Sequence, residues 1–78
     1  MNRNDIFCRI KKVFEDFFDG EVEVNENTSM ENCEEWESVS HIQLIFELEE
    51  EFEMEFEAEQ IADMTSIKKI IDIIETEK

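Results

Sequence analysis

Apolar residues recur at three- and four-residue steps along most of this chain, and no proline interrupts them. This spacing places apolar side chains on one face of a helix, whereas a proline would remove a backbone donor. The first such segment is residues 4–18, with the stripe Ile6, Phe7, Ile10, Val13, Phe14, Phe17 and Phe18. We expect Asn4 to cap this helix, and Asp19-Gly20 to end it because glycine accepts left-handed dihedrals.

Two later segments show the same period. Residues 38–53 predict a helix with the apolar stripe Val39, Ile42, Ile45, Leu48 and Phe52, and with Leu44 and Phe46 at its edges. A short helical turn is expected over 57–62, followed by a last helix from Ile67 that Thr65 or Ser66 caps. The predicted fold class is therefore all-α, a small four-helix bundle of three longer helices and one short helix.

Residues 21–37 lack the helical period and predict a long loop between the first two helices. The segment is rich in Asn, Ser and Thr, whose side chains compete for backbone hydrogen bonds and favour turns. We expect the loop to be ordered but irregular, because four apolar residues can anchor it: Val22, Val24, Met30 and Trp36. With no linker or internal repeat, residues 1–78 predict a single domain.

The charge of the chain limits its partners. It has 23 acidic and 7 basic residues, for a formal net charge of −16. This charge repels nucleic acid and anionic lipid, favours proteins with basic patches, and argues for a monomer. No apolar run is long enough to cross a bilayer and the start lacks a signal-peptide pattern, so we expect a cytoplasmic protein.

Ser38 lies at the predicted junction between the long loop and the second helix. One interpretation is an ordinary N-cap, whose oxygen accepts a backbone N–H and stabilises the helix by about 1 kcal/mol. Ser40 is a rival for that position, because Gln43 follows it at the spacing of a capping box. A second interpretation is a modified serine, since the start of a helix attracts phosphate groups.

His41 follows Ser38 by about one helical turn, so it could pair with a phosphate or act as a base for the serine. A Ser–His hydrolase also needs an orienting acid and an oxyanion site, which a shallow helical surface rarely provides. We therefore expect a protein that is not an enzyme, with His41 facing solvent. Cys8, Cys33 and His41 lack metal-site spacing, and no metal site is predicted.

The run Trp36-Glu37-Ser38-Val39, together with Glu49-Glu50-Glu51-Phe52 downstream, resembles acyl carrier proteins. That family carries Asp-Ser-Leu at the same junction, often after a Trp, and then a helix that ends in an acidic run and a Phe. Here Glu and Val replace the usual Asp and Leu. The resemblance covers nearly the whole chain, and it implies that Ser38 carries 4'-phosphopantetheine from coenzyme A, with Glu37 and Val39 flanking the attachment point.

The resemblance also implies a function. The chain would be a phosphoprotein that holds acyl groups as thioesters and delivers them within a fatty-acid, polyketide or specialised acyl pathway. Its partners would be a phosphopantetheinyl transferase and acyl-loading and acyl-transferring enzymes with basic patches. The expected contact residues are Gln43, Phe46, Glu47, Glu49 and Glu50, although Phe46 also fits simple core packing. The alternative function is an unmodified acidic helical interaction module that binds a basic partner protein.

A last expectation concerns the core, which is rich in phenylalanine and isoleucine. A hypothesis based on the family is that part of this core opens to shelter an acyl chain. The alternative is a core packed to native density, with no room for cargo.

Overall fold

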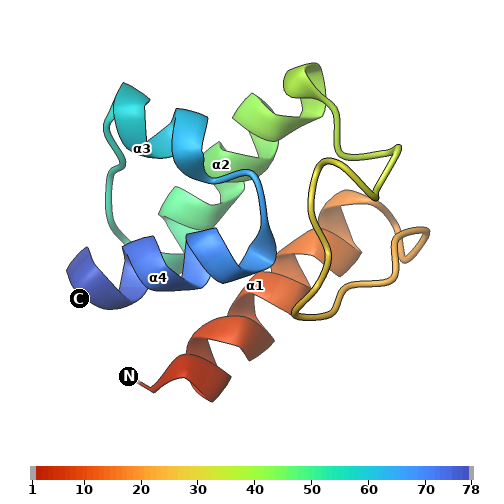
Figure 1. Cartoon of the computed structure of the whole chain (residues 1–78). Helices are drawn as coiled ribbons and strands as arrows, with labels where there is room; N and C mark the ends of the chain where they lie inside the picture. The colour runs from red at the N-terminus through yellow and green to blue at the C-terminus, as the bar shows by residue number, and fades with distance from the viewer. Residues whose placement is uncertain (1, 78) are drawn as a thin grey trace.

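The chain is all-α in a computed structural model, which describes residues 2–77 (Figure 1). Helix α1 spans Arg3–Phe17, α2 Ser38–Phe52, α3 Ala58–Asp63 and α4 Ile67–Glu77. The predicted all-α class is confirmed, while the predicted domain 1–78 extends one residue beyond the described residues at each end. Between residues 2 and 77, no helix has both the length and the apolar character needed to span a bilayer.

Helix α1 begins one residue before the predicted start. The side-chain oxygen of Asn2 accepts a hydrogen bond from the Asp5 N–H at 2.9 Å, so Asn2 is the N-cap. The prediction that Asn4 caps this helix is wrong, because Asn4 already lies in its first turn. The end is as predicted: Asp19 and Gly20 follow the helix with left-handed φ angles of 54° and 75°.

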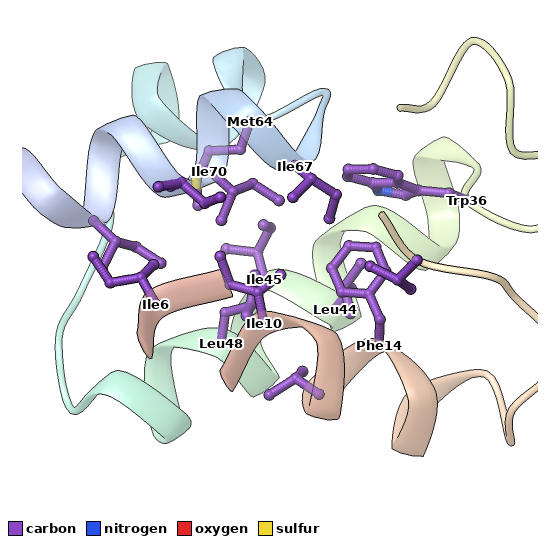
Figure 2. Packing of buried hydrophobic residues seen from close by; sticks show 14 of the residues in the cluster. Ile6, Ile10, Phe14, Trp36, Leu44, Ile45, Leu48, Met64, Ile67 and Ile70 are labelled. Atoms are coloured by element: carbon purple, nitrogen blue, oxygen red, sulfur yellow. The ribbon is translucent and has the colours of Figure 1, made fainter. Parts of the chain in front are cut away.

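Helix α1 packs against both α2 and α4. Figure 2 shows the side chains of these helices meeting in one continuous apolar layer. Nine of them have no exposed surface and are called the central core here: Ile6, Ile10, Phe14, Leu44, Ile45, Leu48, Ile67, Ile70 and Ile74. Burying a side chain of this size stabilises a fold by about 1.5–3 kcal/mol, so the central core supplies a large part of the driving force for folding.

The segment between α1 and α2 is fastened to the rest of the molecule at several points. Its predicted apolar anchors are buried or packed against the core: Val22, Val24, Met30 and Trp36. It also pairs with the junction of α3 and α4, where the Met30 N–H donates to the Thr65 carbonyl at 2.9 Å and the Ile67 N–H donates to the Thr28 carbonyl at 3.0 Å. Backbone pairing of this kind is what holds an irregular segment in one conformation.

Only part of the predicted apolar stripe of α2 is buried. Leu44, Ile45, Leu48 and Phe52 lie in the interior, but Val39 is 76% exposed, Ile42 46% and Phe46 56%. The buried face of the helix is completed by His41 instead. The predicted stripe is therefore wider than the buried face of α2, and the core-packing interpretation of Phe46 is wrong, because Val39, Ile42 and Phe46 lie together on a neighbouring, exposed face of the helix.

Directional hydrogen bonds shape the chain between α2 and α4. Glu53 follows the last residue of α2, and its N–H donates to the carbonyls of Glu49 and Glu50. Its left-handed backbone turns the next N–H, that of Met54, back to the Glu49 carbonyl at 3.1 Å. The Glu57 N–H before α3 donates to Gln60 Oε1 at 2.9 Å. Of the two predicted caps of α4, Ser66 takes the role, since its Oγ accepts from the Lys69 N–H at 3.2 Å. Helix α3 itself has no buried residue.

Candidate functional site

Ser38 is the first residue of α2, and it is exposed to solvent. The N-cap position belongs to Glu37, whose backbone is extended and whose side chain makes no capping hydrogen bond. Both predicted serine caps are therefore wrong: Ser38 is already helical, and Ser40 lies two residues further inside. The free N–H groups of the first turn keep their positive polarity without a side-chain cap.

An open groove of about 420 Å³ begins beside Ser38 and is called the α2–α3 groove here. Its lining is mostly apolar and comes from α2, α3 and two flanking segments: Met30, Ser38, His41, Ile42, Ala58, Ile61, Ala62 and Thr65. The side chains that α3 contributes to the lining include two small ones, Ala58 and Ala62. Their four-residue spacing places both on one helix face, and this was the sequence signal that the prediction missed.

His41 stands between the α2–α3 groove and the interior. It lines the groove, yet only 6% of its surface is exposed. Its Nδ1 lies 3.0 Å from Trp36 Nε1, and its Nε2 lies 2.8 Å from the Ile61 carbonyl oxygen. An indole N–H can only donate, so Nδ1 accepts from Trp36 and Nε2 carries the hydrogen that His41 donates to Ile61. We call this arrangement the His41 clamp.

The clamp corrects the prediction that His41 faces solvent. The physical reason is the buried indole: Trp36 is 1% exposed, and a buried Trp N–H needs an acceptor. Removing His41 would leave the buried Trp36 N–H without a partner, at a cost of about 1–3 kcal/mol, whereas the Ile61 carbonyl would keep the hydrogen bond from the Met64 N–H at 3.2 Å. Because both ring nitrogens are bonded, His41 is not free in this conformation to take a proton from Ser38 or to hold a phosphate.

Three exposed apolar residues form a stripe on α2 that starts next to Ser38: Val39, Ile42 and Phe46. Their spacing places them on one face of the helix. The exposed residues Gln43, Glu47 and Glu50 lie beside them on the solvent side of the same helix. We call these six residues the α2 outer face, and it brings together four of the five predicted contact residues.

Glu49, the fifth predicted contact residue, has a different setting. It is half-buried, and its Oε2 accepts a hydrogen bond from the Phe56 N–H at 2.8 Å. Glu49 therefore ties the end of α2 to the segment that leads into α3. Phe56 is itself buried, so this bond also fixes an apolar side chain beneath the turn.

Residues 2–77 contain no group of three or more His, Cys, Asp or Glu side chains placed to hold a metal ion. Both cysteines are free; Cys8 is exposed and Cys33 is buried.

Comparison of the chain with protein-family models gave no match, and comparison with curated proteins gave none. The chemistry of the site rests on three features of its own residues: an exposed serine at a helix start, an apolar groove beside it and an apolar stripe with acidic neighbours.

Proposed function

We propose that this chain is an acyl carrier protein that holds acyl groups as thioesters on a 4'-phosphopantetheine arm attached to Ser38. The observation that carries the proposal is the position of Ser38, exposed at the start of α2 and beside the α2–α3 groove. A modifying enzyme can reach a hydroxyl at such a junction, and an attached arm has both solvent and an apolar surface next to it. The fold would then be a carrier-type four-helix bundle with a long loop between α1 and α2.

The residues around Ser38 suit the arm. The uncapped N–H groups of the first turn would stabilise the phosphodiester charge by about 0.3–1 kcal/mol at an exposed site. The apolar lining of the groove would accept the aliphatic part of the arm, while Glu37 and Val39 flank the serine where a transferase must bind. When attached, the arm supplies a thiol whose thioesters partner enzymes attack.

The α2 outer face is the proposed contact surface for partner enzymes. An apolar stripe beside acidic residues fits a partner that presents apolar side chains among basic ones. The net charge of −16 would raise the rate of encounter with such a surface more than the final affinity. Brief visits to several enzymes, of a fatty-acid, polyketide or specialised acyl pathway, are compatible with rapid association of this kind.

The proposed carrier is not an enzyme; it is a substrate and a shuttle. The bonding of both His41 nitrogens favours this over a Ser–His hydrolase, whose base must reach the serine hydroxyl. We further propose a cytoplasmic monomer, because the large like charge opposes self-association.

Intact mass tests the proposal directly. The protein is incubated with coenzyme A, Mg²⁺ and a broad-range phosphopantetheinyl transferase, and we expect one pantetheinyl addition. Ser38→Ala should abolish the addition. Ser40→Ala is the matched control, because it removes a neighbouring hydroxyl from the same turn of α2 and should leave the addition intact.

A second candidate function is an unmodified acidic interaction module. The exposed stripe of Val39, Ile42 and Phe46 favours it, since a surface of this kind can bind a basic partner without any arm. The mass experiment separates the two functions. If several transferases all leave the protein unmodified, the carrier function is wrong and the interaction module takes its place.

A further inference from the structure

The wall between the α2–α3 groove and the interior has an unusual composition for an apolar protein core. At that wall, His41 lines the groove on one side and bonds to the buried Trp36 on the other. Its second bond, to the Ile61 carbonyl, fastens α3 to α2 at the same point. A single side chain thus joins the loop, α2 and α3 beside Ser38.

The space behind the clamp is filled with side chains. The Trp36 ring meets the Phe14 ring edge-to-face, with centroids 4.9 Å apart. Figure 2 shows Leu44 and Ile67 in the same part of the interior, and neither has any exposed surface. A chain of methylenes entering from the groove would have to displace His41 and then these packed groups.

Opening this route also has a polar cost. If His41 were displaced from this wall, the buried Trp36 N–H would lose its acceptor, and the Ile61 carbonyl would keep only the hydrogen bond from the Met64 N–H. An acyl chain offers no hydrogen bond in return, because its methylenes neither donate nor accept. The entry of an apolar cargo past His41 would therefore leave the buried Trp36 N–H unpaired, which is unfavourable in apolar surroundings.

We infer that the His41 clamp keeps the core closed to cargo, so that the Ser38 arm of this carrier serves short or polar acyl groups rather than long fatty-acyl chains. The inference rests on the proposed carrier function. Such cargo stays in the α2–α3 groove or in solvent, where partner enzymes reach the thioester without drawing it out of the protein. Because the groove is open, a long alkyl chain lying in it would keep part of its methylenes in water, which the closed core would not allow it to avoid.

Thioester accessibility tests this inference. Ser38 is loaded from acetyl-, hexanoyl- and dodecanoyl-coenzyme A, and intact mass establishes that each arm is attached. Hydroxylamine then cleaves the thioester to an acyl hydroxamate and the free thiol, and the cleavage rate is measured by mass. We expect the three rates to agree within about twofold once each is divided by the rate of the matching acyl-coenzyme A, because no cargo is withdrawn from solvent.

Variants test the role of the clamp. His41→Ala removes the ring between groove and core, and we expect the dodecanoyl thioester to be cleaved several-fold more slowly than the acetyl thioester. Trp36→Phe keeps an aromatic ring but removes the N–H donor, and it provides the same test if His41→Ala does not fold. If neither variant distinguishes the cargoes, the clamp does not keep the core closed.

Two further outcomes distinguish a failure of the inference from a failure of the carrier function. A wild-type protein that protects dodecanoyl several-fold better than acetyl overturns the inference and leaves the carrier function in place. Failure of every transferase to load Ser38 overturns the carrier function, and the inference falls with it.

Discussion

The central core and the region around α3 are held together by different forces. The helices α1, α2 and α4 meet through side chains without any exposed surface, so their packing depends on apolar burial. Helix α3 buries none of its own residues: Ile61 is only partly buried against the core, and hydrogen bonds from His41 to the Ile61 carbonyl and from Gln60 to Glu77 connect the helix to α2 and α4. Apolar burial is non-directional and is shared among many side chains, whereas each of these bonds depends on one donor and one acceptor.

The difference has a functional meaning because Ser38 lies where the two regions meet. Its helix, α2, is anchored in the central core, while the groove beside it has α3 as its other wall. A region held by a few directional contacts opens locally at a lower free energy than the core does. The stable region can therefore hold the serine in place while the weaker region adapts to whatever lies in the groove.

The largest expected effect comes from breaking the central core. Leu48→Ala removes a side chain with no exposed surface from the middle of α2, and it should lower the free energy of unfolding by about 2–5 kcal/mol. Phe46→Ala is the matched control, because it removes a larger side chain from the same helix at a position that is 56% exposed. It should change the stability by less than about 0.5 kcal/mol in urea unfolding experiments. Equal losses would mean that Phe46 is buried in solution.

The second effect comes from breaking the clamp. His41→Leu keeps most of the side-chain volume but removes both hydrogen bonds, and it should lower the free energy of unfolding by about 1–3 kcal/mol. The loss should be local, so amide hydrogen exchange should accelerate in α3 more than in α1. A uniform acceleration across both helices would contradict the distinction between the two regions.

Trp36→Phe completes this test as a double-mutant cycle with His41→Leu. Both substitutions break the same hydrogen bond between Trp36 and His41, so their effects should not add. The coupling energy isolates the clamp from the change in packing that each substitution causes by itself. Strict additivity would show that the bond contributes nothing to stability.

The two regions also differ in how far their structure follows from the sequence. The spacing of apolar residues gives the helices of the central core to within about one residue, because burial there needs only a continuous stripe. The same spacing could not indicate whether Val39 and Ile42 are buried or exposed. A run of apolar residues wider than the buried face of a helix does not reveal which edge faces the core.

The candidate site was predictable only in part. The position of Ser38 follows from the change from loop to helical period, which is a local signal. The burial of His41 depends on an indole before the helix and a carbonyl 20 positions later, and only the tertiary fold brings these groups together. The lining of the groove likewise includes two alanines of α3, which no local pattern in α2 could indicate.

A smaller effect, this time an increase in stability, is expected at Glu53, between α2 of the central core and α3. Glu53 ends α2 with a φ of 52°, a left-handed conformation that is strained for a residue with a Cβ atom. Glu53→Gly should raise the free energy of unfolding by about 0.5–1 kcal/mol, measured by urea titration. Glu53→Ala removes the same charge but keeps the Cβ atom. If it stabilises the protein as much as glycine does, the gain comes from the charge and not from the backbone.

The smallest effect is expected at the far end of the central core, where Arg3 bonds to Asp72 at 2.8 Å and to Glu75 at 3.1 Å. The hydrogen bonds to Asp72 and Glu75 raise the pKa of Arg3. The charged guanidinium therefore stabilises the folded state at every pH below the ordinary pKa of an arginine side chain. Arg3 stays charged near neutral pH, so its contribution to stability should not depend on its own ionisation there. The contribution should become smaller as the salt concentration rises, because all three side chains are about half exposed. Arg3→Met should lower the Tm by less than about 2 °C in dilute buffer and by less still at high salt.

Lys12→Met is the matched control, since it removes one positive charge from an exposed position of the same helix and so raises the net negative charge equally. If the two substitutions lower the Tm by the same amount, the effect of Arg3 is that of net charge alone, and its two ion pairs add nothing to the packing of α1 against α4.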